Sequence, residues 1–313
     1  MIDHRLHVLR MVASHGTVTA AARALNYTPS AVSHQLRSLA RELEVTLLVQ
    51  EGRGVRLTPA ARTLLAHADE LYARWEEMRA DLAATGGRGL GTLRLCGFST
   101  AAATLLPQVA KHLRTVHPAT VVQIIEADPE ECYDLLLADQ ADVAVVVATA
   151  SLPPTVDPRF DQEPLLDDPL DVLLPTDHPL ATRSSVRLSQ TAAEPWILDR
   201  PGRPYHQLVL AACTDAGFAP AIAHQATEWE TAAALVAAGL GIAMIPRLAR
   251  LPAGYAVARV QLHGDPSPSR HILTSVRRGS AHHPEIATTL DALRDAAVRS
   301  QQTLRGDEPP RPV

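Results

Sequence analysis

The sequence predicts an α/β protein with an all-α N-terminal part. Three observations lead to this. Short helical patterns follow one another over the first 43 residues. From Pro59 to Ala84 there is no glycine and no further proline, and after the glycine-rich stretch 85–91, strand and helix patterns alternate. At 313 residues, the chain is long enough for more than one compact unit.

The composition fits a folded protein. Hydrophobic residues make up 46% of the chain and charged residues 20%, which excludes a disordered class. We find no signal peptide and no run of about 18 apolar residues, so we expect a cytoplasmic protein that does not enter membranes. Three scattered cysteines without Cys-x-x-Cys spacing predict neither disulfides nor a zinc site, and we expect them to be inert apolar fillers.

The net charge of −5 is unevenly distributed. Residues 1–58 contain seven arginines and four acidic residues, a net charge of +3, which leaves −8 for the remainder. This asymmetry indicates an N-terminal domain that meets a polyanion. Because Lys111 is the only lysine, phosphate contacts must come mainly from arginine.

Three amphipathic helices are predicted within residues 1–58, which we assign to one DNA-binding domain. We expect Thr19 to cap the second helix, and Thr28 with Pro29 to start the third. The gap 26–28 has the length of a helix-turn-helix turn. The apolar residues expected to share one core are Leu6, Leu9, Val12, Ala13, Ala21, Ala22, Leu25, Val32, Leu36, Leu39 and Leu43.

The third helix has a polar face opposite its apolar one. Its small donors can approach base edges in a major groove, while its arginines suit phosphates or guanine. The alternative is a merely solvated face, which usually carries glutamate and lysine. The residues on this polar face are Ser30, Ser33, His34, Arg37 and Arg41.

A short hairpin is predicted after the third helix, over residues 50–57. Arg53 stands between Gly52 and Gly54 at its tip. A wing of this kind can place an arginine in the minor groove. The sequence therefore predicts a winged helix-turn-helix.

The runs 16–25, 28–39 and 56–60 resemble the DNA-binding domain of LysR-type transcriptional regulators in order and spacing. The resemblance implies a recognition helix from about Ser30 to Arg41. Where the family usually has Phe-x-Arg entering the wing, this chain has Leu48 and Gln50, which weakens one phosphate contact. The predicted DNA-binding residues are Thr28, Pro29, Ser30, Ser33, His34, Arg37, Arg41, Gln50 and Arg53.

Residues 59–85 predict one long helix, which we expect to start at Thr58 as the cap with Pro59 next in sequence. Its apolar residues alternate in spacings of three and four over three heptads, which is typical of a coiled-coil seam. Packing on its own domain is the alternative, but the strict alternation favours pairing of two chains. The predicted dimerisation residues are Leu64, Ala68, Leu71, Trp75, Met78 and Leu82, in register with Ala61.

Residues 91–300 predict a two-lobed α/β effector domain similar to periplasmic-binding-protein-like sensors. We place lobe 1 at about 91–160 and 268–300, lobe 2 at about 161–267, and a disordered tail at 301–313. Within lobe 1 we expect one helix near residues 101–116. The LysR resemblance continues through 105–107, 136–138 with 141–144, and 235–246.

A ligand of such a domain lies between lobes, at the carboxyl ends of strands. Ser99 and Thr100 follow the first strand and precede a helix, where hydroxyls and amides suit an anion; helix capping is the alternative. The resemblance adds contacts near Asp128, Thr149, Arg200, Pro201 and Thr227, for which ordinary structural roles are equally open.

Four rival interpretations are weaker. Gly97 to Ala101 resembles a loose nucleophile elbow, but the second glycine is missing and no motif supplies an oxyanion hole or a histidine partner. Gly239-Leu240-Gly241 precedes its strand and lacks a third glycine, and the histidine pairs lack further metal ligands. A solute-binding transport protein would need an export signal. It would also have no use for a DNA-binding domain.

We therefore expect a LysR-type transcriptional regulator and not an enzyme. Its expected partners are double-stranded promoter DNA and further copies of itself, as a dimer through the long helix and a homotetramer, with RNA polymerase as a candidate. We expect no metal and no cofactor other than an unidentified small-molecule effector.

Overall fold

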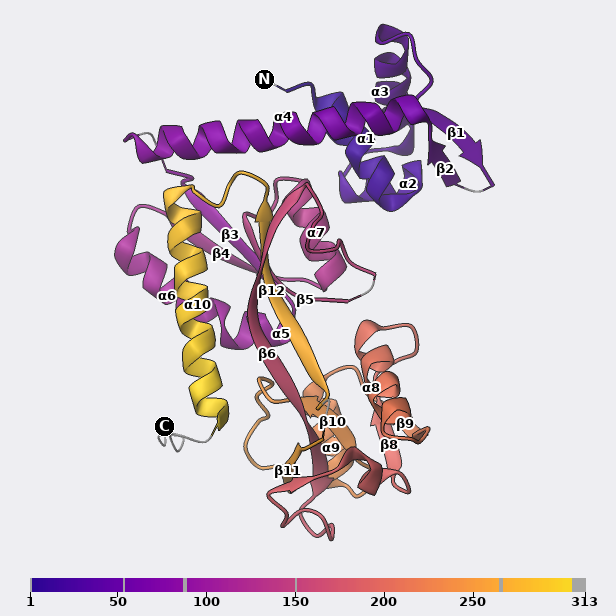
Figure 1. Cartoon of the computed structure of the whole chain (residues 1–313), viewed down its shortest axis with the longest axis vertical. Helices are drawn as coiled ribbons and strands as arrows, with labels where there is room; N and C mark the ends of the chain where they lie inside the picture. The colour runs from indigo at the N-terminus through magenta and orange to yellow at the C-terminus, as the bar shows by residue number, and fades with distance from the viewer. Residues whose placement is uncertain (1, 53, 87–88, 150, 265–266, 306–313) are drawn as a thin grey trace. The chain divides into compact units, whose positions relative to one another are not determined.

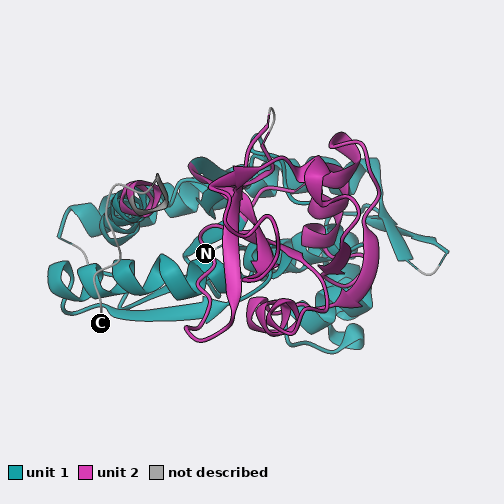
Figure 2. Cartoon of the chain, turned by 90° about the horizontal axis from the view of Figure 1, so that it is seen from below, with its two compact units in different colours: residues 1–146, 150–164, 273–296 teal, residues 147–149, 165–272, 297–313 magenta. Residues whose placement is uncertain are grey.

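A computed structural model describes residues 2–52, 54–86, 89–149, 151–264 and 267–305. The chain forms two compact units, coloured separately in Figure 2. The first contains residues 1–146, 150–164 and 273–296, and the second contains 147–149, 165–272 and 297–313.

The first unit begins with the winged helix-turn-helix that the sequence predicts. It consists of α1 (His4–His15), α2 (Val18–Ala24), α3 (Pro29–Glu42) and an antiparallel hairpin of β1 (Leu48–Glu51) and β2 (Gly54–Leu57). Val32, Leu36 and Leu39 of α3 are buried against residues of α1 and α2 such as Leu9 and Ala22. Leu43 is the exception to the predicted core, because it is the C-cap of α3 and is exposed.

Two of the three expected helix caps are confirmed. Thr28 Oγ1 accepts from Ala31 N at 3.2 Å, and Thr58 Oγ1 accepts from Ala61 N at 3.1 Å, each with a proline next in sequence. The expectation for Thr19 is wrong: α2 starts two residues earlier, where Thr17 Oγ1 accepts from Ala20 N at 3.1 Å.

The long helix is α4 (Pro59–Ala84), drawn as one continuous helix in Figure 1. Ala61 and Ala68 are buried, whereas Leu71, Trp75, Met78 and Leu82 are exposed in the single chain. The predicted stripe therefore packs on its own domain near its start and presents large apolar side chains to solvent further along.

The rest of the first unit is an α/β layer. Parallel strands β3 (Thr92–Gly97), β4 (Val121–Glu126) and β5 (Val143–Val147) lie in the order β4-β3-β5, with β12 (Ser269–Arg277) next. The expected helix 101–116 is two helices, α5 (Ser99–Thr104) and α6 (Leu106–Val116), because Pro107 supports a new helix start but not the middle of an old one. α7 (Pro129–Leu137) precedes β5, and α10 (Pro284–Arg305) ends the described chain.

The second unit has its own α/β layer. β6 (Phe160–Pro175) pairs antiparallel with β10 (Ala243–Pro246) and β11 (Val257–Leu262), and β11 pairs with β7 (Ser185–Val186). β8 (Pro195–Leu198) and β9 (Ala221–Gln225) form a parallel pair. The intervening helices are the 3-10 turn Leu188–Thr191, α8 (Pro204–Asp215) and α9 (Trp229–Ala237).

The structure also bears on the predicted C-terminal tail, on the cysteines and on the expected absence of membrane helices. The tail expected from residue 301 starts too early, because α10 continues to Arg305; residues 306–313 lie outside the described part. Cys96, Cys132 and Cys213 are free and buried, as expected of apolar fillers. No helix within the described residues is long and apolar enough to cross a membrane.

Candidate DNA-binding surface and effector-binding residues

The exposed face of α3 gathers most of the residues that the sequence predicts to bind DNA. Ser30, His34, Arg37 and Arg41 are exposed and Ser33 is half-buried, while the opposite face of the same helix is in the core. Arg37 and Arg41 form no ion pair with any acidic residue in the described ranges of the chain. Both guanidiniums are therefore available to an external anion.

The start of α3 is built by its own side chains. Thr28 and Pro29 are exposed, and Thr28 Oγ1 lies 3.0 Å from Ser30 Oγ while it caps Ala31 N. Asn26, in the turn between α2 and α3, has a φ of 55°, a left-handed conformation that asparagine tolerates better than most residues. The cap and this turn fix where the polar face of α3 begins.

The wing is attached to the corner between α1 and α2. Val55 N donates to Gly16 O at 3.1 Å, and Arg62 Nη1 of α4 donates to Leu57 O at 3.0 Å. Gln50 is exposed on β1. Arg53, predicted at the tip, lies outside the described residues. The backbone contact with Gly16 was not predictable from the sequence, because nothing in a helix pattern marks which carbonyl will accept.

Ser99, Thr100 and Asp128 follow two neighbouring parallel strands of the first unit. Gly97 of β3 pairs with Glu126 of β4, and Ala127 N donates to Gly97 O at 3.1 Å, so residues 99, 100 and 128 lie at the same sheet edge. Ser99 and Asp128 are exposed, whereas Thr100 is buried. The N-cap of α5 is Phe98, so Ser99 and Thr100 do not cap that helix.

Arg200 and Thr227 of the second unit are hydrogen-bonded to each other. Arg200 Nε donates to Thr227 Oγ1 at 3.1 Å, and Thr227 Oγ1 donates to Asp199 Oδ1 at 3.1 Å. Asp199 directly follows β8 and is only 8% exposed. Its other oxygen, Oδ2, accepts from Arg203 Nε at 2.9 Å. Pro201 is exposed beside this group, and Thr149, which follows β5, belongs to the same unit.

Asp199 is the residue of this group that the sequence analysis missed. An acid between an apolar strand and Arg-Pro-Gly-Arg is the signal that was available. The buried carboxylate of Asp199 holds the cation of Arg203 directly and that of Arg200 through the hydroxyl of Thr227, which lies between an acceptor and a donor.

Two family models together match nearly the whole chain. The model described as bacterial regulatory helix-turn-helix protein, lysR family, matches residues 4–62, and the LysR substrate binding domain matches residues 86–298. The second match alone covers more than half of the chain.

Curated relatives are similar over most of their length. An uncharacterized HTH-type transcriptional regulator of Bacillus subtilis, YvbU, is 29% identical over 245 residues, which cover 78% of this chain and 81% of that protein. A probable hydrogen peroxide-inducible genes activator of Streptomyces viridosporus is 28% identical over 302 residues, covering 94% and 95%.

Solved structures share the fold. Full-length OxyR of Pseudomonas aeruginosa, in a variant form, has a TM-score of 0.64 at 23% identity and covers 94% of this chain and 95% of its own. Full-length CbnR, crystallised with its target DNA, has a TM-score of 0.55 at 23% identity and covers 95% and 100%. The predicted resemblance is confirmed: this chain belongs to the LysR family of bacterial transcriptional regulators, which bind DNA through a helix-turn-helix and are not enzymes.

Proposed function

We propose that the chain binds double-stranded promoter DNA as a dimer paired through α4, and that dimers assemble into a tetramer. The observation that carries the proposal is the exposed face of α3, where Arg37 and Arg41 have no ion-pair partner within the described residues. The face suits a major groove, with hydroxyls near the start of the helix for base edges and guanidiniums further along for phosphates.

Pairing through α4 is supported by four large apolar side chains that the single chain leaves in solvent: Leu71, Trp75, Met78 and Leu82. They follow heptad spacing, so a second α4 can cover them. A helix of about 26 residues spans about 39 Å, which is close to one turn of DNA and can separate two heads onto two half-sites. CbnR, with the same fold, has been crystallised on its target DNA.

We further propose that a small molecule bound by the α/β part changes how the heads are presented to DNA. The groups Ser99, Thr100 and Asp128, and Arg200, Thr227 and Asp199, supply hydroxyls and charges at the carboxyl ends of strands, where ligands of α/β sheets bind. RNA polymerase is the partner we propose at the promoter. A regulator of chromosomal promoters acts in the cytoplasm, where we place this chain.

Direct peroxide sensing by the thiols is not the signal that we propose, although some relatives carry that name. The three cysteines are buried, and burial raises the pKa of Cys213 to about 12. A thiol must be both accessible and deprotonated to react with peroxide.

The test is a mobility shift of the purified protein on its own upstream intergenic DNA at two salt concentrations. Arg37→Ala should weaken binding and reduce the slope of log affinity against log salt by about 1, because one phosphate-facing cation is lost. Arg74→Ala is the matched control, an exposed arginine on α4 that pairs with Glu77 within the helix. Equal binding by the wild type and Arg37→Ala at both salt concentrations would contradict the proposal.

A further inference from the structure

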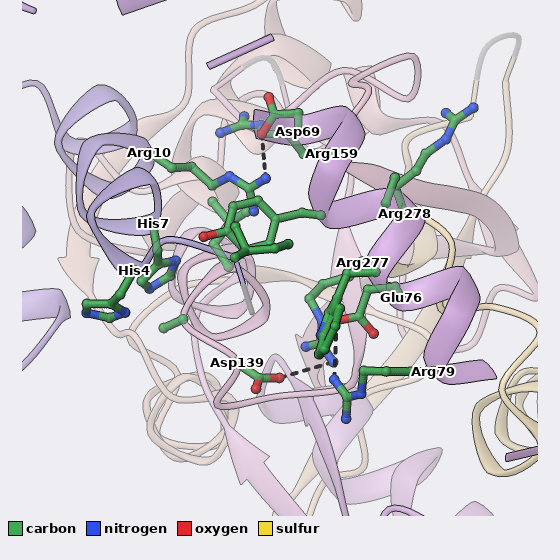
Figure 3. Close-up of a pocket in the computed structure, with 16 residues that line it drawn as sticks. His4, His7, Arg10, Asp69, Glu76, Arg79, Asp139, Arg159, Arg277 and Arg278 are labelled. Carbon is green, nitrogen blue, oxygen red and sulfur yellow. Dashed lines mark hydrogen bonds and ion pairs between the residues drawn. The ribbon is translucent and has the colours of Figure 1, made fainter. Parts of the chain in front are cut away.

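The end of β12 contacts the linker helix α4 at two points. Arg277, the last residue of β12, directs Nε to Glu76 Oε1 of α4 at 3.2 Å. Gly279, two residues later, has a φ of 86°, and a Cβ placed there would collide with the backbone oxygen of Ala73 on α4. Figure 3 shows the Glu76–Arg277 pair at the wall of a cavity of about 410 Å³.

The ion pair is shielded from solvent. The side chains of Arg277 and Glu76 are 10% and 12% exposed, so water screens their attraction weakly. Glu76 Oε1 also accepts from Arg79 Nη1 at 3.3 Å, which holds the carboxylate in place from within α4. Arg277 is held from the other side by Asp142 Oδ1 at 3.2 Å and by the carbonyl oxygens of Leu136 and Ala141.

β12, like β5 and β6, has residues in both compact units. Its residues 269–272 lie in the second unit and 273–277 in the first. A strand is stiff along its length, so a displacement imposed on one end is carried to Arg277 and Gly279. From there the buried ion pair and the backbone contact act on α4, and α4 is continuous with the DNA-binding head through Thr58 and Pro59.

We infer that Arg277 and Gly279 are positioning residues for the DNA-binding heads: they dock α4 on the effector domain and thereby set the spacing of half-sites that a dimer accepts. This rests on the proposed function, in which paired heads bind two half-sites. When α4 is docked, the two heads of a dimer keep one distance and orientation. When α4 is released, the heads sample several orientations, so the dimer gains less affinity from binding two half-sites at one spacing.

The experiment changes α4 and the glycine and leaves Arg277 intact, because Arg277 also supports α7 and β5. Glu76→Ala removes the ion pair, and Glu70→Ala is its matched control, since Glu70 is an exposed acid of α4 that pairs with His67 within the helix. Gly279→Ala adds a methyl group against Ala73. Gly217→Ala is its control, with an almost identical φ of 87° and nothing within 4 Å of the added Cβ, so both substitutions carry the same backbone strain.

Binding of each full-length variant is measured on three DNAs: one half-site, the footprinted two-half-site operator, and that operator with five base pairs inserted between half-sites, about half a helical turn. Glu76→Ala and Gly279→Ala should bind the single half-site within twofold of wild type and the operator about tenfold more weakly. The insertion should weaken wild type and both controls more than tenfold, but these two variants less than threefold.

A wild-type preference for spacing in both variants would overturn the inference and leave the proposed function standing. Failure of the wild type to bind any of the three DNAs would overturn the proposed function and this inference with it. A variant that is merely less stable would lose affinity for all three DNAs in parallel, which also counts against a positioning role.

Discussion

The guanidinium of Arg10 lies 2.6 Å from Asp69 and 3.9 Å over the ring of Tyr72, which joins α1 to α4. Arg10 is 6% exposed, and burial lowers its pKa while it raises the pKa of Asp69. Each charge is therefore tolerated largely because the other is present. The pair ties the helix-turn-helix to the linker helix at a point where little water can replace either partner.

Replacing Arg10 by alanine should destabilise the protein by about 3 kcal/mol at pH 7, because the carboxylate of Asp69 then stays buried without a cation. The folded pKa of Asp69 would lie further above its unfolded value, so the folded state binds more protons and stability falls as pH rises through that window. The loss should therefore be smaller at pH 4.5 than at pH 7. Urea unfolding at pH 4.5 and pH 7 measures this loss of unfolding free energy, with Arg74→Ala as the control. A loss that is the same at both pH values would contradict this account.

Single residues differ in how far the sequence reveals them. The polar face of α3 was predictable because helical periodicity alone separates Arg37 and Arg41 from Val32 and Leu36. Asp199 was not, because its importance comes from Thr227, 28 positions later, and only the pairing of β8 with β9 brings the two together. Residues whose role depends on contacts between distant parts of the chain produce no periodic pattern in the sequence.

At the scale of elements, α4 leaves a row of large apolar side chains exposed from Leu71 to Leu82. Leu71 and Leu82 are 54% and 60% exposed in the single chain, so replacing them by glutamate should cost the folded subunit little. In a paired helix the same change would bury charge in the seam. Leu71→Glu with Leu82→Glu should raise the dimer dissociation constant at least a hundredfold by analytical ultracentrifugation. Leu240→Glu, at an exposed leucine outside α4, should leave it unchanged; an intact dimer in the double variant would exclude this seam.

Element boundaries were predictable where a single strong signal marks them. Threonine followed by proline correctly predicted the starts of α3 and α4. Where two signals compete, the prediction failed. Thr17 and Thr19 are both suitable caps, but α1 ends in a left-handed turn at Gly16, so α2 starts directly after Thr17. The helical pattern predicts one helix through Pro107, whereas a new helix, α6, begins at the residue before it.

On the whole-molecule scale, β4 is an edge strand of its sheet with an apolar outer surface. Val121 is 58% exposed, and Ile124 and Val116 of the adjacent helix are also exposed. An uncovered apolar edge invites another strand or subunit, and we propose that it helps to join dimers into a tetramer. Val121→Lys should reduce the particle mass from tetramer to dimer in light scattering, while Val156→Lys, at an exposed valine in a turn, should not. A tetramer that persists in Val121→Lys would place the contact elsewhere.

The buried cysteines have a practical consequence for following how the heads move. Cys96, Cys132 and Cys213 are free and buried in the α/β part. A hydrogen bond with Cys96, together with burial, raises the pKa of Cys132 well above its usual range. At neutral pH the thiols of Cys132 and Cys213 stay protonated, and burial keeps all three cysteines out of reach of maleimides. A cysteine introduced at an exposed position such as 74 would thus be the preferred target for a fluorophore, so head-to-head distances could be followed by energy transfer with the native sulfurs left in place.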